Sequence, residues 1–218
     1  MHVLITGANR GIGHALFDTY EASGALVTGT HRSDDADGRN WQTLDVSDPA
    51  SHTAMAERLG GVPIDLLVCN AGVYLDKGQS LDDGYAAEMW AQQFAVNVTG
   101  VFLTIQTLLP NIRASKTGKI AIISSVMATQ ENAPGGGYIY RSSKAAVLNV
   151  GRNLAVDLKP EGIPVGIYHP GWVQTDMGGE QAAITVEQSA SGLAERFKAL
   201  SLETTGCFEA YDGSPLAF

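Results

Sequence analysis

Short apolar runs alternate with stretches of helical periodicity along almost the whole chain, and this alternation constrains the fold more than any other feature. Uninterrupted apolar runs such as Ile64–Cys69 are typical of parallel strands covered on both faces, where right-handed crossovers place the helices. We therefore expect an α/β fold with one doubly wound parallel β-sheet, in a single domain spanning residues 1–218. The expected strands are His2–Thr6, Ala25–Thr30, Trp41–Val46, Ile64–Cys69, Lys119–Ser124, Pro164–His169 and Cys207–Tyr211.

The stretches between the strands carry apolar residues three and four apart, the spacing of a helix that packs one face on a sheet. The segment Ser33–Asn40 differs from them because it is polar, acidic and contains glycine. We predict that a loop replaces the helix between the second and third strands. The expected helices are Gly11–Ala22, a helix that starts at Ser47 or Asp48 and ends near Leu59, Ala87–Leu109, Tyr140–Leu158 and Val186–Ala199.

The composition restricts the partners and the location that we expect. The chain has 14 basic and 23 acidic residues and a formal net charge of −9, so its average field repels phosphate backbones and anionic lipids. We expect no nucleic-acid partner and no membrane partner. The chain opens directly on a predicted strand without the pattern of a signal peptide, which favours a cytoplasmic location. The histidines show no metal-ligand spacing and the two cysteines, Cys69 and Cys207, lie far apart, so no metal site is expected.

A glycine-rich turn follows the first predicted strand, with the sequence Thr6-Gly-Ala-Asn-Arg-Gly-Ile-Gly13. Glycines allow the backbone to turn tightly and to approach a pyrophosphate, and the N-terminus of the following helix favours an anion. The spacing is G-x-x-x-G-x-G rather than the commoner G-x-G-x-x-G. An ordinary glycine turn between a strand and a helix is the alternative interpretation.

Tyr140 and Lys144 lie four residues apart on a predicted helix, so their side chains share one face. A phenol has a pKa of about 10, and acid–base work near neutrality requires this to fall by about 3, at a cost of roughly 4 kcal/mol. An adjacent ammonium favours the phenolate and supplies part of this energy. Such a pair also arises by chance, so it needs support from the rest of the sequence.

Other polar or glycine-bearing positions follow strands or lie inside helices. Ser124 and Ser125 close a strand, and Asn97 lies in an otherwise apolar helix, where a buried amide must find partners. Strand-end capping and a satisfied polar core residue are the alternative interpretations. Asn70-Ala71-Gly72 and Pro170-Gly171 each follow a strand and could be simple turns. All the strand-end positions fall at one edge of the predicted sheet, where ligands of such folds bind.

Together, the motifs T-G-A-N-R-G-I-G, N-A-G, S-S, Y-R-S-S-K and P-G-W-V-Q-T, with Asn97 in its helix, resemble the short-chain dehydrogenase/reductase superfamily over essentially the whole chain. The stretch His169–Gly179 and the closing Y-D-G-S-P-L-A-F resemble its sniffer/C-factor-like branch of carbonyl reductases. The resemblance implies a Rossmann fold and a nicotinamide cofactor. The shortened Ser33–Asn40 connection departs from the family pattern.

The resemblance implies a catalytic tetrad of Asn97, Ser125, Tyr140 and Lys144. In that arrangement Tyr140 protonates the substrate oxygen, which Ser125 holds, while Lys144 lowers the Tyr140 pKa and binds the nicotinamide ribose. Asn97 positions a water in the proton relay. The resemblance further implies that the cofactor contacts Tyr140 and Lys144 together with Gly7, Asn9, Arg10, Gly11, Ile12, Gly13, Arg32, Asp45, Val46, Asn70, Ala71, Gly72, Pro170, Gly171, Val173 and Thr175.

We expect NADP(H) to be preferred over NAD(H), which remains possible. The second strand ends with Thr30-His31-Arg32, without the acidic residue that favours a free 2′-hydroxyl, and Arg32 suits a 2′-phosphate. Arg10 is expected to converge on the same phosphate, although both arginines could be solvated surface charges. Candidate walls of the substrate pocket are Tyr74, Met127, Trp172 and Met177, which plain packing also explains.

The predicted function is therefore NADP(H)-dependent interconversion of a carbonyl compound, a ketone or an aldehyde, and its alcohol. A nucleotide-binding signalling protein on the same fold is the alternative, and a methyltransferase would give no role to Tyr140 and Lys144. The helix Ala87–Leu109 carries more apolar residues than packing on a sheet requires, so we expect a homodimer or homotetramer. These apolar residues are Trp90, Phe94, Val96, Val98, Phe102, Leu103, Ile105 and Leu108.

Overall fold

Seven parallel strands form one twisted sheet in the computed structural model, which describes residues 1–32, 39–131 and 133–218. The strand order is β3-β2-β1-β4-β5-β6-β7, so the chain runs outward from β1 to one edge and then returns to fill the other side. The point where this order reverses lies between β1 and β4. The strands are β1 His2–Ile5, β2 Leu26–His31, β3 Trp41–Thr43, β4 Leu66–Cys69, β5 Lys119–Ile123, β6 Val165–His169 and β7 Phe208–Ala210.

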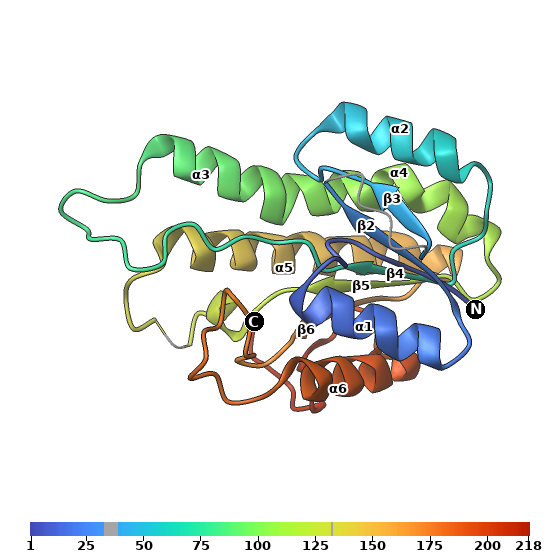
Figure 1. Ribbon diagram of the computed structural model, residues 1–218. Coiled ribbons are helices and arrows are strands. Elements are labelled where there is room, and N and C mark those ends of the chain that lie inside the picture. Colours follow the sequence, from blue (N-terminus) through green and yellow to red (C-terminus); the bar gives the residue numbers. More distant parts are fainter. Residues whose placement is uncertain (33–38, 132) are drawn as a thin grey trace.

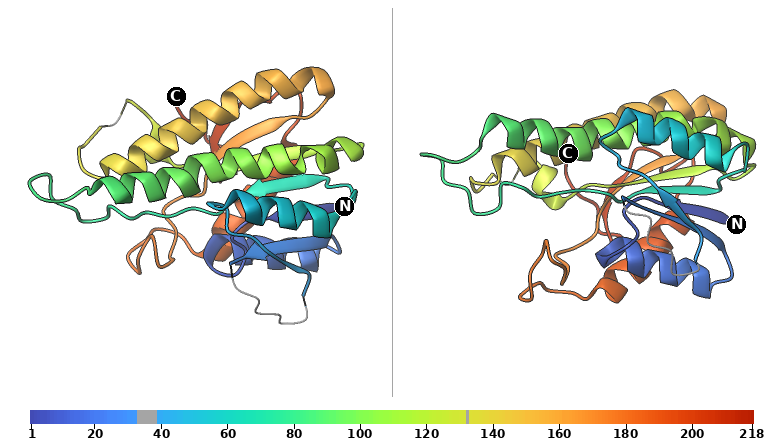
Figure 2. Two further views of the ribbon diagram at one scale, coloured as in Figure 1. Left: turned by 90° about the horizontal axis from the view of Figure 1, so that it is seen from above. Right: turned by 45° about the horizontal axis from the view of Figure 1, so that its top comes forward.

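Helices cover both faces of the sheet, as Figure 1 shows. Helices α1 (Gly11–Ala22) and α6 (Val186–Ala199) pack on one face through a core that includes Phe17, Leu193 and Phe197. The opposite layer is seen from above in Figure 2, with its helices side by side. It consists of α2 (Pro49–Leu59), α3 (Ala87–Phe94), the π-helical turn η1 (Ala95–Thr99), α4 (Gly100–Ala114) and α5 (Tyr138–Leu158). Short 3₁₀ turns, η2 (Val126–Ala128) and η3 (Lys159–Glu161), flank α5.

The doubly wound parallel sheet predicted from the sequence is confirmed, and the differences lie at the ends of elements. The third strand ends at Thr43 instead of Val46, because Asp45 accepts hydrogen bonds from Ser47 and turns the chain toward α2. Helix α2 begins after Asp48, which caps it with its side chain and settles the Ser47 or Asp48 alternative. Helix α5 starts at Tyr138, two residues earlier than predicted.

The long helix predicted over Ala87–Leu109 runs on to Ala114 and contains Pro110. The π-helical turn η1 interrupts it, and this turn was not predicted. By length and composition the stretch Ala87–Ala114 could cross a membrane, which qualifies the expectation of no such segment. Val101, Ile105 and Leu108 lie in the core under the sheet, however, as in the core helix of a soluble protein.

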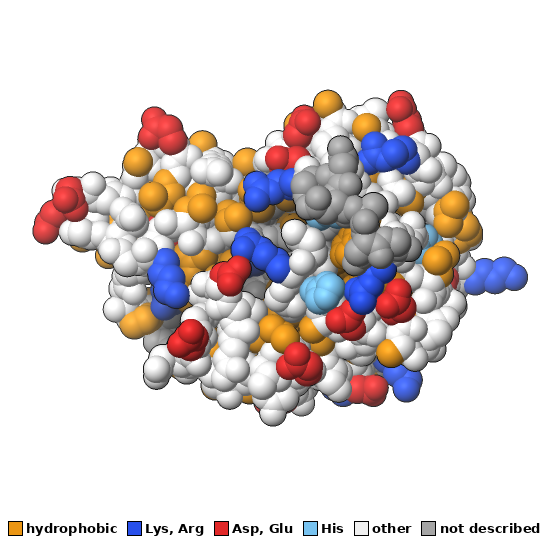
Figure 3. Space-filling view, in the orientation of Figure 1, with side chains coloured by type: hydrophobic (Ala, Val, Ile, Leu, Met, Phe, Trp, Pro, Cys, Tyr) orange, Lys and Arg blue, Asp and Glu red, His pale blue; other side chains and the backbone are white. Residues whose placement is uncertain are grey.

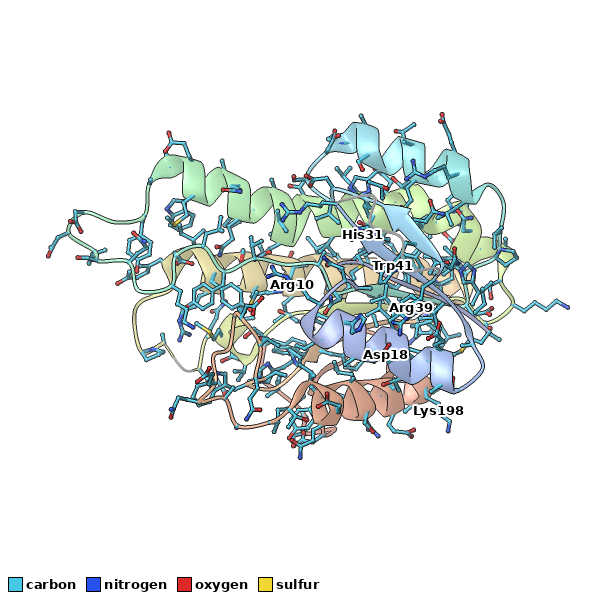
Figure 4. All side chains as sticks on the ribbon, viewed as in Figure 1. Arg10, Asp18, His31, Arg39, Trp41 and Lys198 are labelled. Carbon is cyan, nitrogen blue, oxygen red and sulfur yellow. The ribbon has the colours of Figure 1, made fainter. Side chains whose placement is uncertain are left out.

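Residues 33–38, which make up most of the predicted Ser33–Asn40 loop, lie outside the described residues. Beside them, Trp41 stacks on Phe17 of α1, with ring centroids 5.0 Å apart. Gly29 of β2 is required there, because a side chain at this position would meet the Trp41 ring. Arg39 forms an ion pair with Asp18 of α1 at 2.8 Å, and Figure 4 labels this group at the β2–β3 edge. Aromatic packing therefore covers this edge of the sheet.

Candidate active site

The glycine turn after β1 packs against the Asn70-Ala71-Gly72 turn after β4. Gly7 has a φ of +64°, and a Cβ on Gly13 would lie 2.4 Å from the Gly7 carbonyl oxygen. Asn70 Nδ2 donates to the carbonyl oxygens of Thr6 and Gly7 at 3.0 and 3.1 Å. Thr6 Oγ1 accepts the backbone N–H groups of Asn70 and Ala71. Both turns are thus held together at the point where the strand order reverses.

The start of α1 has the features that a pyrophosphate requires. Its N-cap residue Arg10 makes no side-chain capping hydrogen bond, so a side chain does not occupy the first N–H groups of the helix. Gly11 is partly exposed and puts no side chain over the backbone beside it, and Asn9 and Arg10 are exposed. Ile12 anchors the turn by packing on the core. The residues present therefore fit a dinucleotide cofactor at this helix N-terminus.

Tyr140, Ser125 and Lys144 come together below the carboxyl ends of β4 and β5. The Ser125 side chain lies near enough to the Tyr140 hydroxyl to lower the pKa of that phenol. Lys144 Nζ lies 5.7 Å from the centre of the Tyr140 ring and donates to the carbonyl oxygen of Ile123 at 2.9 Å. Ser124 instead donates to the Lys144 carbonyl oxygen at 3.0 Å. The geometry therefore brings the second serine, and not the first, to Tyr140.

Burial perturbs both titratable groups of this cluster. Desolvation raises the pKa of Tyr140 to about 12, with the hydrogen bond to Ser125 acting in the opposite direction. Desolvation lowers the pKa of Lys144 to about 8. Without further positive charge near it, Tyr140 is a neutral phenol at pH 7, ready to donate a proton. Groups with opposed perturbations beside a cleft are typical of acid–base sites.

Asn97 lies in the π-helical turn η1 and is 1% exposed. Its side chain accepts the Val73 N–H at 2.8 Å, and donates to the Val73 carbonyl oxygen at 2.9 Å and to Ser143 at 3.0 Å. A Cβ placed on Gly72 would lie 3.4 Å from Asn97 Oδ1 and 3.5 Å from Lys144 Nζ. The glycine therefore allows the turn after β4 to come close to both. A π-turn inside a helix is frequent at functional sites.

The segment after β6 closes the other side of the cleft. Gly171 has a φ of +90°, and Val173 pairs with Ile184 in an isolated bridge. A Cβ on Gly11 would lie 3.4 Å from the Thr175 methyl group, which brings this segment to the glycine turn. Pro170 accepts a hydrogen bond from Ser189 of α6. The residues predicted after β1, β4 and β6 therefore lie together at the carboxyl ends of the strands.

Arg10, one of the two arginines predicted to share a phosphate, forms an ion pair in the structure. The guanidinium of Arg10 forms an ion pair with the carboxylate of Asp176, in the segment after β6, at 2.8 Å. Figure 3 shows basic side chains, one touching an acidic one, in the middle of the face on which Figure 4 labels Arg10. Arg32 lies near Asp45, whose pKa is lowered first by its hydrogen bond with Ser47 and also by Arg32. Val46 follows Asp45 in the chain, and its carbonyl oxygen lies against Gly100, the first residue of α4.

Of the four predicted pocket walls, Tyr74 lies closest to the reacting group, since its ring stacks on that of Tyr140 with centroids 4.2 Å apart. Gly137 faces Tyr74 and Met127 from the start of α5. Trp172 and Met177 are partly exposed, and Trp172 donates to the Gly178 carbonyl oxygen. Sequence reasoning missed Ser143 and two further buried groups, Asp76 and Gln93. The position of Gln93, four residues before Asn97 in an apolar helix, was the available signal.

The fold and this arrangement define an α/β protein of the dinucleotide-binding class, with Tyr140 and Lys144 close together at the carboxyl ends of its strands. The chain belongs to the short-chain dehydrogenase family, since the family described as short chain dehydrogenase matches residues 1–184. It is 36% identical, over 97% of both chains, to 1-hydroxy-2-glutathionyl-2-methyl-3-butene dehydrogenase of Rhodococcus sp. (strain AD45). It is 37% identical to the C-signal protein of Myxococcus xanthus over 70% of this chain and 91% of that one.

Among solved structures, the fold is similar to that of NADPH-bound carbonyl reductase from chicken fatty liver. The TM-score is 0.91 and the identity 28%, and the match covers 100% of this chain and 98% of that one. The chain is thus an oxidoreductase-family protein of the nicotinamide-dependent class. Its resemblance to the carbonyl reductase branch, inferred from short motifs, is confirmed.

Proposed function

We propose that the protein is an NADP(H)-dependent oxidoreductase that interconverts a ketone or aldehyde and the corresponding alcohol. The observation that carries this proposal is the cluster of Tyr140, Ser125 and the buried Lys144. Ser125 lies beside the phenol hydroxyl, and the Lys144 ammonium lies 5.7 Å from the centre of the phenol ring. A nicotinamide bound in this cleft supplies or accepts hydride at the substrate carbon. Tyr140 and Ser125 are then both in position to contact the substrate oxygen.

In the direction of reduction, Tyr140 gives its proton to the carbonyl oxygen while Ser125 donates a hydrogen bond to the same oxygen. The Lys144 ammonium stabilises the phenolate that remains and binds the ribose next to the nicotinamide. Asn97 holds the turn after β4 in place. It also positions a water through which a proton from solvent reaches the Tyr140 phenolate once the alcohol has formed. The reverse direction uses the same groups, with Tyr140 as the base.

The preference for NADP(H) rests on Arg32, which directly follows β2, and on the absence of an acidic side chain at His31. Arg10 joins Arg32 only by leaving Asp176. Solved relatives with NADPH or NADP bound support the same choice. NAD(H) remains the weaker cofactor in this proposal.

The substrate is a small to medium, partly apolar carbonyl compound, because the candidate pocket walls Tyr74, Met127 and Trp172 are largely apolar. We propose a cytoplasmic homodimer or homotetramer. Phe102 on α4 is 40% exposed and Val156 on α5 is 72% exposed, and an apolar contact between copies would cover such side chains. Light scattering at micromolar concentration tests the assembly, and a monomer would contradict it.

The test of function is a screen of aldehydes, ketones and alcohols followed by the absorbance of reduced nicotinamide. A second candidate function, signalling by nucleotide binding, is favoured by the 37% identity to C-signal. Thermal protection by NADPH without turnover of any carbonyl compound would favour that second function. Turnover that disappears in Tyr140→Phe supports the enzyme.

A further inference from the structure

Asp76 is a carboxylate buried between the turn after β4 and the start of α5. Only 1% of its surface is exposed. Its Oδ2 accepts the Ile139 N–H at 2.8 Å and its Oδ1 accepts the Tyr140 N–H at 3.1 Å. Gln93 Nε2 lies 3.5 Å from the same Oδ1. The carboxylate therefore reaches two N–H groups of the first turn of α5 from a position 63 and 64 residues earlier in the chain.

This contact replaces a local cap. The N-cap residue of α5 is Gly137, in the left-handed region with a φ of +56°, and it has no side chain to offer to the first turn. Burying a carboxylate is costly unless N–H donors and positive charge meet it. The positive end of the helix dipole and two N–H donors meet this one. Because this cap comes from a distant segment of the chain, the position of that segment fixes the position of the helix start.

The segment that carries Asp76 is itself clamped by two buried amides four residues apart. Asn97 holds the backbone of Val73 on both sides, and Gln93 Oε1 accepts the Leu75 N–H at 2.7 Å. Gln93 is completely buried. Residues 73–76 thus have little freedom relative to α3 and η1.

The same segment contacts both the ring and the backbone of Tyr140. Tyr74 stacks on the phenol ring at 4.2 Å, with 17° between the ring planes, while Asp76, two residues later, holds the backbone N–H. Ring and backbone are therefore fixed from one short, rigid piece of chain. The direction of the Tyr140 hydroxyl follows from both contacts.

We propose that Asp76, held by Gln93, is a positioning residue for Tyr140: it fixes the first turn of α5 so that the phenol hydroxyl meets Ser125 and the substrate oxygen. This inference rests on the proposed function, because it assigns the carboxylate a part in the proton transfer by Tyr140. It predicts that loss of the carboxylate lowers kcat with little effect on the distant pyrophosphate end of the cofactor site.

The experiment compares Asp76→Ala and Asp76→Asn with the control Asp65→Ala in the full-length protein. Asp65 also joins separate segments, because it accepts hydrogen bonds from the His2 N–H at 2.7 Å and from the hydroxyls of Ser115 and Thr117. It lies just before β4, at the opposite ends of the strands from Asp76. Each variant is assayed at a temperature where circular dichroism shows it folded. The measurements are kcat, KM for the carbonyl substrate and Kd for NADPH from fluorescence.

We expect Asp76→Ala to lower kcat roughly 10- to 100-fold, the order of loss that a misplaced reacting group causes. Kd for NADPH should stay within about threefold, because the pyrophosphate site does not depend on α5. Asp76→Asn keeps one acceptor for two N–H groups, so its kcat should lie between those of Asp76→Ala and the wild type. Asp65→Ala should keep the wild-type kcat.

A folded Asp76→Ala with the kcat of Asp65→Ala overturns the inference, as does an equal loss of kcat and of NADPH affinity. If Asp76→Ala does not fold, Asp76→Asn decides, and a wild-type kcat in that variant overturns it. Tyr140→Phe is assayed in parallel. A wild type that turns over no carbonyl compound would remove the proposed function itself, and turnover by Tyr140→Phe would remove its proton donor. An inactive Tyr140→Phe beside a fully active Asp76→Ala removes only the role of Asp76.

Discussion

All strands of the parallel sheet begin at one side, which we call the amino edge, and finish at the other, which we call the carboxyl edge. Polar side chains lie at both, but they have different roles there. At the amino edge, before β1, β4 and β5, polar groups bind other parts of the protein: Asp65 accepts from His2, Ser115 and Thr117. Lys119 donates to the carbonyl oxygens of Leu200 and Lys198 at 2.6 and 3.1 Å, at the end of α6. These contacts hold the fold together.

At the carboxyl edge the same kinds of group are buried at an energetic disadvantage. Lys144 is 5% exposed and its pKa is lowered by burial, while the pKa of Tyr140 is raised by burial. Positive-φ glycines and an uncapped helix α1 leave backbone N–H groups facing the cleft. The difference indicates that stability is given up at the carboxyl edge to keep reactive groups in place, as functional sites commonly do.

The largest effect should come from Tyr140→Phe, which removes the proton donor and nothing else of the carboxyl edge. We expect kcat to fall about 10²- to 10⁴-fold, the usual contribution of a general acid. Cofactor affinity should remain within a few-fold, because the ring and its stacking on Tyr74 stay. Kinetics with a carbonyl substrate and fluorescence titration with NADPH check both parts.

The control for that substitution is Tyr138→Phe, on the same helix but 39% exposed. It should leave kcat unchanged. A Tyr140→Phe variant with more than about a tenth of the wild-type kcat would disprove the general-acid role, since such a role contributes at least about 10²-fold.

Lys144→Met tests whether the carboxyl edge gives up stability. A pKa of about 8 in place of 10.5 corresponds to a penalty of roughly 3 kcal/mol for the buried ammonium at pH 7. Met removes this penalty but also the hydrogen bond to Ile123, so we expect a net gain of roughly 1–3 kcal/mol in the free energy of unfolding. Turnover and NADPH affinity should both fall.

This gain has a defined pH dependence. Between about pH 8 and 10.5 the unfolded chain binds the lysine proton more tightly than the folded chain, so the wild type becomes relatively more stable as the pH rises through this window. The advantage of Lys144→Met should therefore be largest below pH 8 and shrink toward pH 10. Thermal unfolding of both proteins across this range checks it, and a Lys144→Met variant less stable than the wild type at pH 7 would contradict it.

Lys119→Met is the matched substitution at the amino edge. Burial lowers the pKa of Lys119 as well, but Lys119 is only half-buried and donates to three carbonyl oxygens, so we expect a smaller effect of opposite sign. Lys119 donates to carbonyl oxygens at the C-terminal end of α6, where a cation is favoured. Its loss should lower the free energy of unfolding by roughly 1–2 kcal/mol, or a few degrees in Tm. The kcat of the folded variant should stay that of the wild type, and a loss of turnover would mean that the two edges are not separate.

How much of each edge can be predicted from the sequence depends on how far apart along the chain the interacting residues lie. The alternation of strands and helices and the glycine turn follow from local patterns, since β1, α1 and the turn between them are contiguous. Tyr140 and Lys144 share a helix face because they are four residues apart. The tetrad assignment needed the family resemblance, and the structure brings its members together.

Features that depend on distant contacts escaped prediction. The start of α5 at Tyr138 depends on Asp76, and a propensity argument does not see a cap 63 residues away. The π-helical turn at Asn97 depends on the clamp with Val73 and Ser143. Arg10 was placed beside Arg32 from the position of both after strands, yet the ion pair with Asp176 decides its direction.

An effect on cofactor recognition at the carboxyl edge should come from Arg32→Ala. His31, the last residue of β2, is buried and packs edge-on against Trp41 at 5.2 Å, so Arg32 is the first exposed side chain after the strand. Its guanidinium lies close enough to Asp45 to help lower the pKa of that carboxyl. A 2′-phosphate there would gain charge-assisted hydrogen bonds that a free 2′-hydroxyl does not form.

We therefore expect Arg32→Ala to lower kcat/KM for NADPH about tenfold, which is about 1.4 kcal/mol, and to leave kcat/KM for NADH nearly unchanged. Arg10→Ala should have a smaller effect on the same ratio, because Asp176 already competes for that guanidinium, and the exchange of one exposed partner for another is worth little. Kinetics with both cofactors in the three proteins decide the matter. Equal wild-type values for NADPH and NADH, or a preference that survives Arg32→Ala unchanged, would show that Arg32 does not recognise the 2′-phosphate.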